Sequence, residues 1–378
     1  MYVSVDQSGK FLSLMGADSV RQRYHAIWLR DNAQDEATRS TQNGQRLIAL
    51  QDIPDDLYIE SATLDDNSLR IRFQPESVSI DYSLNWLSEH AYDMETDKLP
   101  GWVDDSTELW NNLSVKALPS ISFAELVENR NALMNWLEGV RRFGVGRVND
   151  GPVDADAILR VVDQFGFVRK TNYGDVFDVR TELNPTNLAY TGLGLQAHTD
   201  NPYRDPVPTL QILYCLENSA EGGESMVVDG FYAAKQLQQE NLEWFNVFTK
   251  YCARFEYAGS ADVHLKARKP MIELSPDGEI IAIRFNNRSC APTTDVPFDQ
   301  METFYAAYRR FGELIDQESA AVTFKLSPGD CFVVDNTRVL HARKGYSGAG
   351  SRWLRGCYAD KDGLYSTLSS LKSEQNGV

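Results

Sequence analysis

The stretch Ser327–His341, SPGDCFVVDNTRVLH, decides which fold the sequence predicts. Its Ser-Pro-Gly-Asp turn leads into an apolar strand, and His341 comes just past that strand. From about residue 168 onward the chain repeats this pattern of short strand-like stretches bounded by Gly, Pro and Asn. Strands are expected over residues 186–191, 208–216, 224–228, 279–286, 321–327, 330–335 and 352–359. Many short strands joined by such turns indicate a β-sandwich or jelly roll.

Outside this region the sequence predicts a small β-rich domain and several helices. Residues 58–64 and 69–73 alternate in polarity around a polar turn and predict a hairpin. A helix is expected to begin at Ser122, which has capping-box spacing to Glu125, and further helices are expected over 154–164, 230–248 and 298–317. The fold class is therefore mainly β with peripheral helices. The expected divisions are a β-rich N-terminal domain over 1–95, a linker over 96–118, a jelly-roll domain over 119–372 and a frayed tail over 373–378.

Composition excludes several classes of partner. The chain has 378 residues, is 42% hydrophobic and carries a formal net charge of −17, which argues against a binder of nucleic acid or of an anionic membrane surface. Its five cysteines are scattered and form no CxxC pair. A signal peptide and a membrane-spanning apolar run are not expected, so the sequence predicts a cytoplasmic protein.

His198-Thr199-Asp200 is the candidate metal site. Two residues that are two positions apart on a strand share one face, so His198 and Asp200 can bind one metal ion. A His-x-Asp triplet alone is more often a polar pair on the surface. His341 changes this interpretation, because two imidazoles and one carboxylate can bind one face of Fe(II) and leave the other face open. The other histidines are expected to have structural or surface roles; they are His25, His90 and His264.

Arg352 begins the last predicted strand of the jelly roll. The planar guanidinium of arginine suits bidentate capture of a carboxylate, although an ordinary arginine on an edge strand would give the same pattern. Arg355 is expected to face the opposite side of the strand, so only one of the two can point into a barrel.

These residues, taken together, resemble a known family, the γ-butyrobetaine hydroxylases within the taurine-dioxygenase-like 2-oxoglutarate oxygenases. The motifs that carry the resemblance are Trp28-Leu29-Arg30-Asp31-Asn32, His198-Thr199-Asp200-Asn201-Pro202-Tyr203, Gly222-Gly223-Glu224-Ser225, Val228-Asp229-Gly230-Phe231, Phe285-Asn286-Asn287, Asp335-Asn336 with His341, and Ser351-Arg352 with Tyr358-Ala359-Asp360. They extend over nearly the whole chain.

The resemblance implies a double-stranded β-helix catalytic core behind the small N-terminal β domain. It implies Fe(II) on His198, Asp200 and His341, with 2-oxoglutarate as co-substrate and its distal carboxylate on Arg352. In that family O₂ converts the co-substrate to succinate and CO₂ while the substrate is hydroxylated. Relatives suggest a homodimer.

One departure concerns zinc. In the γ-butyrobetaine enzymes, cysteines after the Leu-Arg-Asp-Asn signature help to hold a structural zinc ion. Here the signature is followed by Ala33-Gln34-Asp35-Glu36-Ala37-Thr38, and residues 1–214 contain no cysteine. No zinc is therefore expected in the N-terminal domain.

The resemblance also implies an aromatic cage for a trimethylammonium group. Aromatic faces attract a quaternary ammonium by about 0.5–2 kcal/mol each, without hydrogen bonds. The aromatic residues could equally be part of the core. The residues at the matching positions are Tyr173, Phe177, Tyr190 and Tyr358.

The other end of the substrate is expected to be anionic. Its candidate ligands combine one guanidinium with polar donors, and they are Asn187, Asn201, Tyr203, Asn287 and Arg288. Arg30 is a weaker candidate, if the N-terminal domain covers the site. Such donors suit a phosphonate better than a carboxylate, because a phosphonate has more charge and three oxygens.

The first-choice substrate is therefore 2-(trimethylamino)ethylphosphonate, hydroxylated at C1 next to phosphorus in phosphonate catabolism. The alternative is γ-butyrobetaine, hydroxylated to carnitine. An iron oxygenase of a sulfonate or an uncharged acid is a further alternative. An alternative of another class is a non-catalytic protein that binds quaternary ammonium ions, but such a protein has no need of three metal ligands and an arginine.

Overall fold

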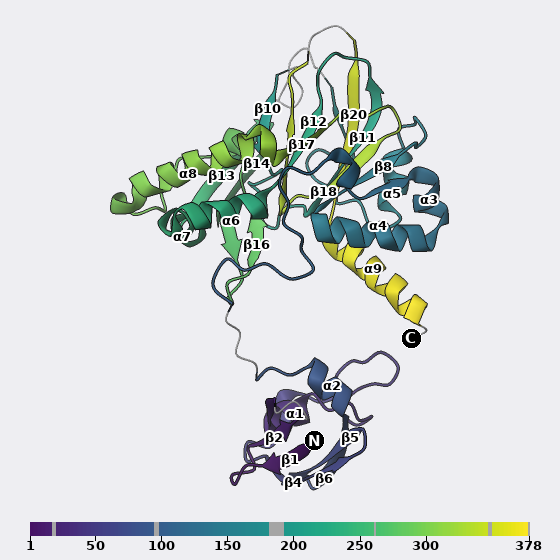
Figure 1. Cartoon of the computed structure of the whole chain (residues 1–378), viewed down its shortest axis with the longest axis vertical. Helices are drawn as coiled ribbons and strands as arrows, with labels where there is room; N and C mark the ends of the chain where they lie inside the picture. The colour runs from purple at the N-terminus through teal and green to yellow at the C-terminus, as the bar shows by residue number, and fades with distance from the viewer. Residues whose placement is uncertain (17–19, 94–97, 181–192, 261, 347–349, 377–378) are drawn as a thin grey trace. The chain divides into compact units, whose positions relative to one another are not determined.

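The computed structural model describes residues 1–16, 20–93, 98–180, 193–260, 262–346 and 350–376 (Figure 1). The chain divides into two compact units, Met1–Asp97 and Lys98–Val378. No helix in the part of the chain that the structure describes is long and apolar enough to cross a bilayer.

The N-terminal unit consists of two small antiparallel sheets. The alternation of apolar and polar residues along each strand determines which face of the sheet is buried. On β5, Leu69, Ile71 and Phe73 are fully buried while the residues between them are exposed. The predicted hairpin is confirmed, since β4 and β5 pair around a turn that begins at Asp65↔Ser68. The elements are β1 (Tyr2–Val5), β2 (Phe11–Met15) and β3 (Arg21–His25) in one sheet, β4 (Tyr58–Asp65), β5 (Ser68–Gln74) and β6 (Val78–Ser83) in the other, and helices α1 (Ala26–Asp31) and α2 (Leu84–Glu89).

The second unit is built around two β-sheets, which confirms the predicted jelly roll. The six-stranded sheet has the order β7-β8-β18-β11-β20-β9, and the four-stranded sheet has the order β10-β19-β12-β17. All pairs are antiparallel except β7 with β8. The first sheet contains β7 (Ser120–Ser122), β8 (Val145–Asn149), β9 (Phe177–Val179), β11 (Leu210–Asn218), β18 (Cys331–Asp335) and β20 (Arg352–Ala359). The second contains β10 (Leu195–His198), β12 (Ser225–Asp229), β17 (Ala321–Phe324) and β19 (Val339–Arg343).

The stretch Ser327–His341 forms one strand of each sheet. Strand β18 lies in the six-stranded sheet and β19 in the four-stranded sheet, so the turn between them carries the chain from one layer to the other. Arg338 in this turn is fully buried and forms an ion pair of 2.7 Å with Asp229 at the end of β12. Its guanidinium also donates to the backbone carbonyls of Glu108 and Arg142. The Arg338 side chain thereby joins the turn between the sheets to the end of β12 and to the backbone at Glu108 and Arg142.

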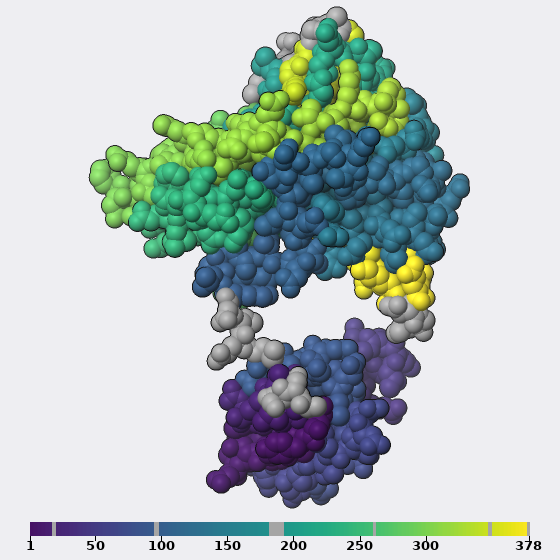
Figure 2. Space-filling model, in the orientation of Figure 1, coloured from purple at the N-terminus to yellow at the C-terminus, as the bar shows by residue number. Residues whose placement is uncertain are grey.

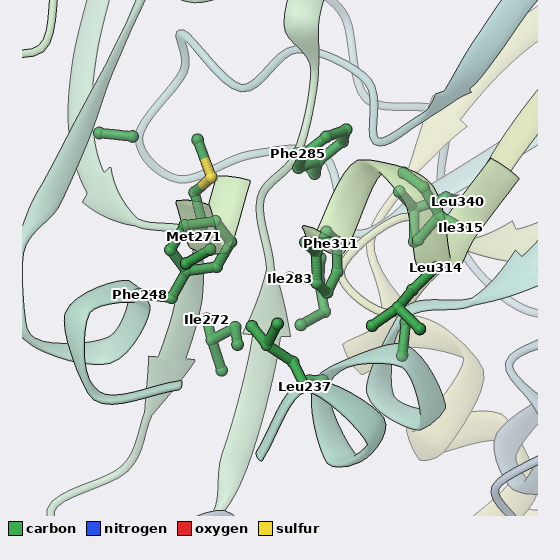
Figure 3. Packing of buried hydrophobic residues seen from close by; sticks show 14 of the residues in the cluster. Leu237, Phe248, Met271, Ile272, Ile283, Phe285, Phe311, Leu314, Ile315 and Leu340 are labelled. Carbon is green, nitrogen blue, oxygen red and sulfur yellow. The ribbon is translucent and has the colours of Figure 1, made fainter. Parts of the chain in front are cut away.

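Helices cover both flanks of the sheets (Figure 1). On one flank α3 (Phe123–Glu128), α4 (Arg130–Phe143), α5 (Ala157–Val162) and α9 (Lys361–Asn376) pack on the six-stranded sheet. On the other flank lie α6 (Gly230–Glu240), α7 (Leu242–Lys250) and α8 (Met301–Asp316), with β13 (Cys252–Ser260), β14 (Val263–Pro270), β15 (Ile272–Leu274) and β16 (Ile280–Ile283). Figure 3 shows the hydrophobic core on this second flank, where Leu237 of α6, Phe248 of α7, Phe311 of α8 and Ile283 of β16 pack together.

Two predicted helices are each divided in two by an asparagine. The Ser122 capping bond to the Glu125 backbone is present, but the helix stops at Asn129, whose side chain caps α4. Asn241 likewise ends α6 and caps α7. Asparagine competes for backbone donors in this way because its short side chain accepts from the N–H groups of the following turn.

The segment predicted as a linker belongs in large part to the second unit. Its Trp110 is buried and its backbone N–H donates to Asp229, while Gly101 donates to the Gly278 carbonyl. Figure 2 shows residues of this segment, in dark blue, lying across one face of the unit. The predicted frayed tail also differs, since α9 continues to Asn376. The predicted strand over 186–191 lies outside the described residues.

We expect Arg338→Met to lower the free energy of unfolding by about 3–5 kcal/mol, because it leaves the buried Asp229 carboxylate without its cation. The matched control is Arg310→Met, which removes an exposed guanidinium paired with Glu240 and Glu313 and should cost about 0–1 kcal/mol. Urea unfolding of the two variants measures the difference. Equal losses would show that the buried pair does not hold the two sheets together.

Candidate active site

His198 and His341 face each other across two neighbouring strands. Strand β10 pairs antiparallel with β19, and the register puts His198 directly opposite His341. Residues opposite each other in such a pair project from the same face of the sheet. The two rings are buried and their centroids lie 4.3 Å apart.

Asp200 completes a group of three possible metal ligands. Its Oδ1 lies 3.4 Å from His198 Nε2 and 3.8 Å from His341 Nε2. One ligand atom from each residue falls within 4.8 Å of the others. Two imidazoles and a carboxylate on one side of a metal ion, with open positions opposite, suit non-haem Fe(II). Within the described residues, this is the group of His, Cys, Asp and Glu side chains that could hold a metal ion.

Hydrogen bonds orient these ligands. His198 Nδ1 lies 2.7 Å from the Gln196 carbonyl, so it donates there and Nε2 carries the lone pair. In this structure that lone pair accepts from Arg288 Nη2 at 2.7 Å, and it would be given to a metal ion when one is bound. The second carboxylate oxygen of Asp200, Oδ2, accepts from Gln211 Nε2 at 2.6 Å and from the Tyr358 hydroxyl at 2.8 Å. Only Oδ1 is therefore directed at the two imidazoles.

The ionisation states also fit a metal site. Burial lowers the pKa of His341 to about 3, so its ring is neutral at neutral pH. Burial alone would raise the pKa of Asp200, but the neighbouring His198 and His341 rings and the Tyr358 hydroxyl hold that pKa well below its usual range. A neutral imidazole and an ionised carboxylate are the forms that bind a metal ion.

Asn336 positions the backbone of Asp200 from the turn between β18 and β19. Its Oδ1 accepts from the Asp200 N–H at 2.6 Å, and its Nδ2 donates to the carbonyls of Asp200 and Pro208. The same turn that crosses between the sheets thus fixes the carboxylate ligand.

A cavity of about 320 Å³ opens beside the three ligands. One wall is aromatic: Tyr173 lies 6.1 Å from Phe177 and 5.9 Å from Tyr257, and Phe177 lies 5.1 Å from Tyr358, between ring centroids. The predicted cage residues Tyr173, Phe177 and Tyr358 are thus brought together, whereas Tyr190 lies outside the described residues. Tyr257 also belongs to this wall but was not predicted, because no local pattern in the sequence shows that β13 packs against it.

Arginines line another part of the cavity. Arg352 is buried, its Nε donates to the Gly223 carbonyl, and no carboxylate among the described residues pairs with it. Arg343 was not predicted, yet it lines the same cavity, and both guanidiniums lie over the ring of Tyr346, at 5.1 Å for Arg343 and 5.8 Å for Arg352. The sequence did contain a signal for Arg343. It follows His341 by two positions, so on a strand the two side chains share one face. Arg355 pairs instead with Asp178.

The predicted anion ligands do not all meet. Arg288 is exposed as a residue, but its guanidinium reaches the cavity, where Nη2 lies 2.7 Å from His198 Nε2. Burial of that group lowers its pKa. Asn201 and Tyr203 also line the cavity, and the Tyr203 hydroxyl donates to Asn201 Oδ1 at 2.8 Å. Asn187 lies outside the described residues.

The predicted role of Asn287 at the anionic end stays a prediction. Asn287 is exposed and is not among the described residues that line the cavity; its side-chain carbonyl accepts from the Tyr308 hydroxyl at 3.0 Å. Its neighbour Asn286 lines the cavity instead and donates to the Thr199 carbonyl. Arg30, in the N-terminal unit, pairs with Glu76 at 2.9 Å and donates to Thr38.

Comparison with known proteins gives matches over nearly all of the chain. Residues 101–358 match the family described as taurine catabolism dioxygenase TauD, TfdA family, and residues 3–88 match the N-terminal domain of γ-butyrobetaine hydroxylase-like proteins. The γ-butyrobetaine dioxygenase of Pseudomonas sp. (strain AK-1) is 31% identical over 96% of this chain and 94% of its own length. The mitochondrial trimethyllysine dioxygenase of Bos taurus is 29% identical over 92% of this chain and 83% of its own length.

A solved structure has the same fold. The crystal structure of asparagine oxygenase (AsnO) superposes with a TM-score of 0.51 at 17% identity, covering 64% of this chain and 93% of the other. At this identity the likeness concerns the fold alone.

We expect Gln211→Met to weaken binding of Fe(II) to the isolated protein about 10- to 100-fold, because Asp200 Oδ2 loses a donor that orients the carboxylate. Gln196→Met is the matched control; its side chain donates to Asp316, away from the cavity, and its affinity should be unchanged. Anaerobic titration calorimetry measures both. An unchanged affinity in Gln211→Met would contradict the orienting role of Gln211.

Proposed function

This chain belongs to the TauD, TfdA family of dioxygenases, and from that premise we propose that it uses Fe(II) and 2-oxoglutarate to hydroxylate a small zwitterion that carries a trimethylammonium group. The observation that carries the proposal is the aromatic wall beside the His198–Asp200–His341 group. The matching relatives have names that denote γ-butyrobetaine and trimethyllysine as substrates, and both compounds contain this cation.

We propose that His198, Asp200 and His341 hold Fe(II). Iron with 2-oxoglutarate and O₂ supplies the oxidising power that removes hydrogen from an unactivated carbon. The three side chains occupy one side of the metal position, so the cavity side is left for the co-substrate and O₂. Arg352 Nε donates to the Gly223 carbonyl. The two Nη atoms of Arg352 would then be left to bind the distal carboxylate of 2-oxoglutarate. Arg343 adds a second cation beside it.

The aromatic wall would hold the trimethylammonium group and set which carbon faces the metal. Tyr173, Phe177, Tyr257 and Tyr358 contribute ring faces that need no hydrogen-bond partner on the ligand. Tyr173 and Tyr203 share a hydrogen bond of 2.9 Å, which fixes both rings. A rigid cage places the reacting carbon without a large loss of entropy on binding.

For the anionic end we propose a phosphonate, with 2-(trimethylamino)ethylphosphonate hydroxylated at C1 as the substrate. Arg288 supports this choice because its guanidinium lines the same cavity as Asn201 and Tyr203. With iron on His198 Nε2, Arg288 would give up its contact with that atom and would be left to bind the head group. The Asn201 Nδ2 atom is buried and has no hydrogen-bond partner among the described residues, so it can donate to a ligand oxygen. A dianionic head group with three oxygens uses such donors more fully than a carboxylate does.

The second candidate is γ-butyrobetaine, which the name of the Pseudomonas relative favours. A side-by-side assay of the two compounds with Fe(II) and 2-oxoglutarate, reading succinate and hydroxylated product, tests the choice. We expect coupled turnover of the phosphonate with the higher kcat/KM. A higher kcat/KM for γ-butyrobetaine would assign the second function, and uncoupled succinate release with both would overturn the trimethylammonium proposal.

We expect Phe177→Leu to raise the KM for the trimethylated substrate about 2- to 30-fold, because one ring face contributes about 0.5–2 kcal/mol to binding the cation. Phe298→Leu, at a residue that is 98% exposed, is the matched control and should leave KM unchanged. The uncharged tert-butyl analogue, in which carbon replaces the quaternary nitrogen, should respond much less to Phe177→Leu. Equal responses of the two substrates would remove Phe177 from the cage.

A further inference from the structure

Tyr308 lies on α8, outside the cavity, and contacts the short segment that carries Arg288. Its hydroxyl donates to Asn287 Oδ1 at 3.0 Å and lies 3.1 Å from Cys290 Sγ. Burial raises the pKa of both Tyr308 and Cys290, so the hydroxyl and the thiol keep their protons. The thiol can then donate to the hydroxyl while the hydroxyl donates to Asn287. The two partners of Tyr308, Asn287 and Cys290, lie on either side of Arg288 in the sequence.

The segment is anchored at its other points as well. Before Arg288, the Phe285 carbonyl accepts from the Thr199 N–H and the Phe285 N–H donates to the Thr199 hydroxyl, while Asn286 Nδ2 donates to the Thr199 carbonyl. After it, Cys290 bridges to Phe255 of β13. Between these anchors lies one turn of 3-10 helix, Asn287–Ser289, which a single turn of backbone hydrogen bonds holds weakly. Within the part of the chain that the structure describes, Tyr308 gives this turn side-chain contacts from the helical layer, through Asn287 and Cys290.

We propose that Tyr308 is a positioning residue for the anionic end of the substrate: it holds Asn287 away from the cavity and thereby fixes the turn from which the Arg288 guanidinium reaches the site. The inference rests on the proposed function, because Arg288 is there the cation that binds the head group. It also gives Asn287 a role other than direct contact with substrate. The tyrosine ring is itself fixed, at 5.4 Å from Phe285 in an edge-on contact.

The proposal makes Tyr308 a residue for substrate affinity and head-group choice, with no part in the chemistry at the metal. Its hydroxyl is not among the described groups that line the cavity. Loss of the hydroxyl would let the 3-10 turn sample other conformations, so fewer molecules would present Arg288 correctly. Affinity falls in proportion to the fraction of the protein in the competent conformation.

The test is Tyr308→Phe, which keeps the buried ring and removes the hydroxyl. We expect the KM for the zwitterionic substrate to rise about 3- to 10-fold, the equivalent of one lost hydrogen bond, while kcat and the KM for the co-substrate stay unchanged. Tyr305→Phe is the matched control, one turn earlier on the same helix and exposed, and should change nothing. Asn287→Ala removes the other end of the bond and should reproduce the effect.

A double-mutant cycle separates this inference from the proposed function. If Tyr308 acts through Arg288, Tyr308→Phe should have no further effect on KM in an Arg288→Met background. If Arg288→Met by itself leaves substrate KM unchanged, the proposed anion site fails. If Arg288→Met raises KM but Tyr308→Phe does not, the anion site stands and the positioning role is overturned. A rise in KM with Asn287→Ala that Tyr308→Phe does not share would instead show that Asn287 contacts the substrate directly.

Discussion

The crossing between the two sheets is the constraint on which the rest of this structure depends. Between β18 and β19 the chain leaves one layer and enters the other, and the Arg338–Asp229 pair holds that crossing in the interior. A buried guanidinium is tolerated only where carboxylate and carbonyl oxygens satisfy it, and Arg338 has both. Two positions earlier, Asn336 bonds both backbone groups of Asp200. The link between layers and the geometry of the metal ligands therefore share one turn.

The charged side chains that line the cavity lie in separate places. The carboxylate of Asp200 uses one oxygen for Gln211 and Tyr358 and directs the other at the two imidazoles. Arg343 and Arg352 lie together over Tyr346, while Arg288 reaches the His198 side of the cavity. Two anionic ligands, the co-substrate and the head group of the substrate, can thus be held at different places. The aromatic wall of the same cavity suits the cation of the proposed substrate, whose methyl groups exclude hydrogen bonding.

Some of the site was predictable because its residues stand close together or follow a clear turn signal. The triplet His198-Thr199-Asp200 is local, and His341 follows an apolar strand whose turn residues mark its start. The predicted reason for the first pair is wrong, because β10 ends at His198 and Asp200 lies in the bend after it, where Asn336 holds its backbone. Other members depend on contacts across the fold. Tyr257 reaches the aromatic wall from the β13–β14 hairpin, which no pattern in the sequence places there. Nor does the sequence show that Asn286 lines the cavity while Asn287 bonds to Tyr308, a helix residue far from both along the chain.

By itself, then, the sequence determined the β-rich class, strands such as β11, β12, β17, β18 and β20, and the two-His, one-carboxylate group, since side-chain alternation and turn chemistry are local properties. Neither β10 nor β19 was among the predicted strands. The tertiary structure decided which oxygen of Asp200 faces the histidines, that Arg343 joins Arg352, and that Asn287 turns away from the cavity. Those outcomes depend on the pairing of strands such as β10 with β19 and β11 with β20, which are far apart in the chain. Such pairings follow from burying the whole core at once, and no single stretch of residues encodes them.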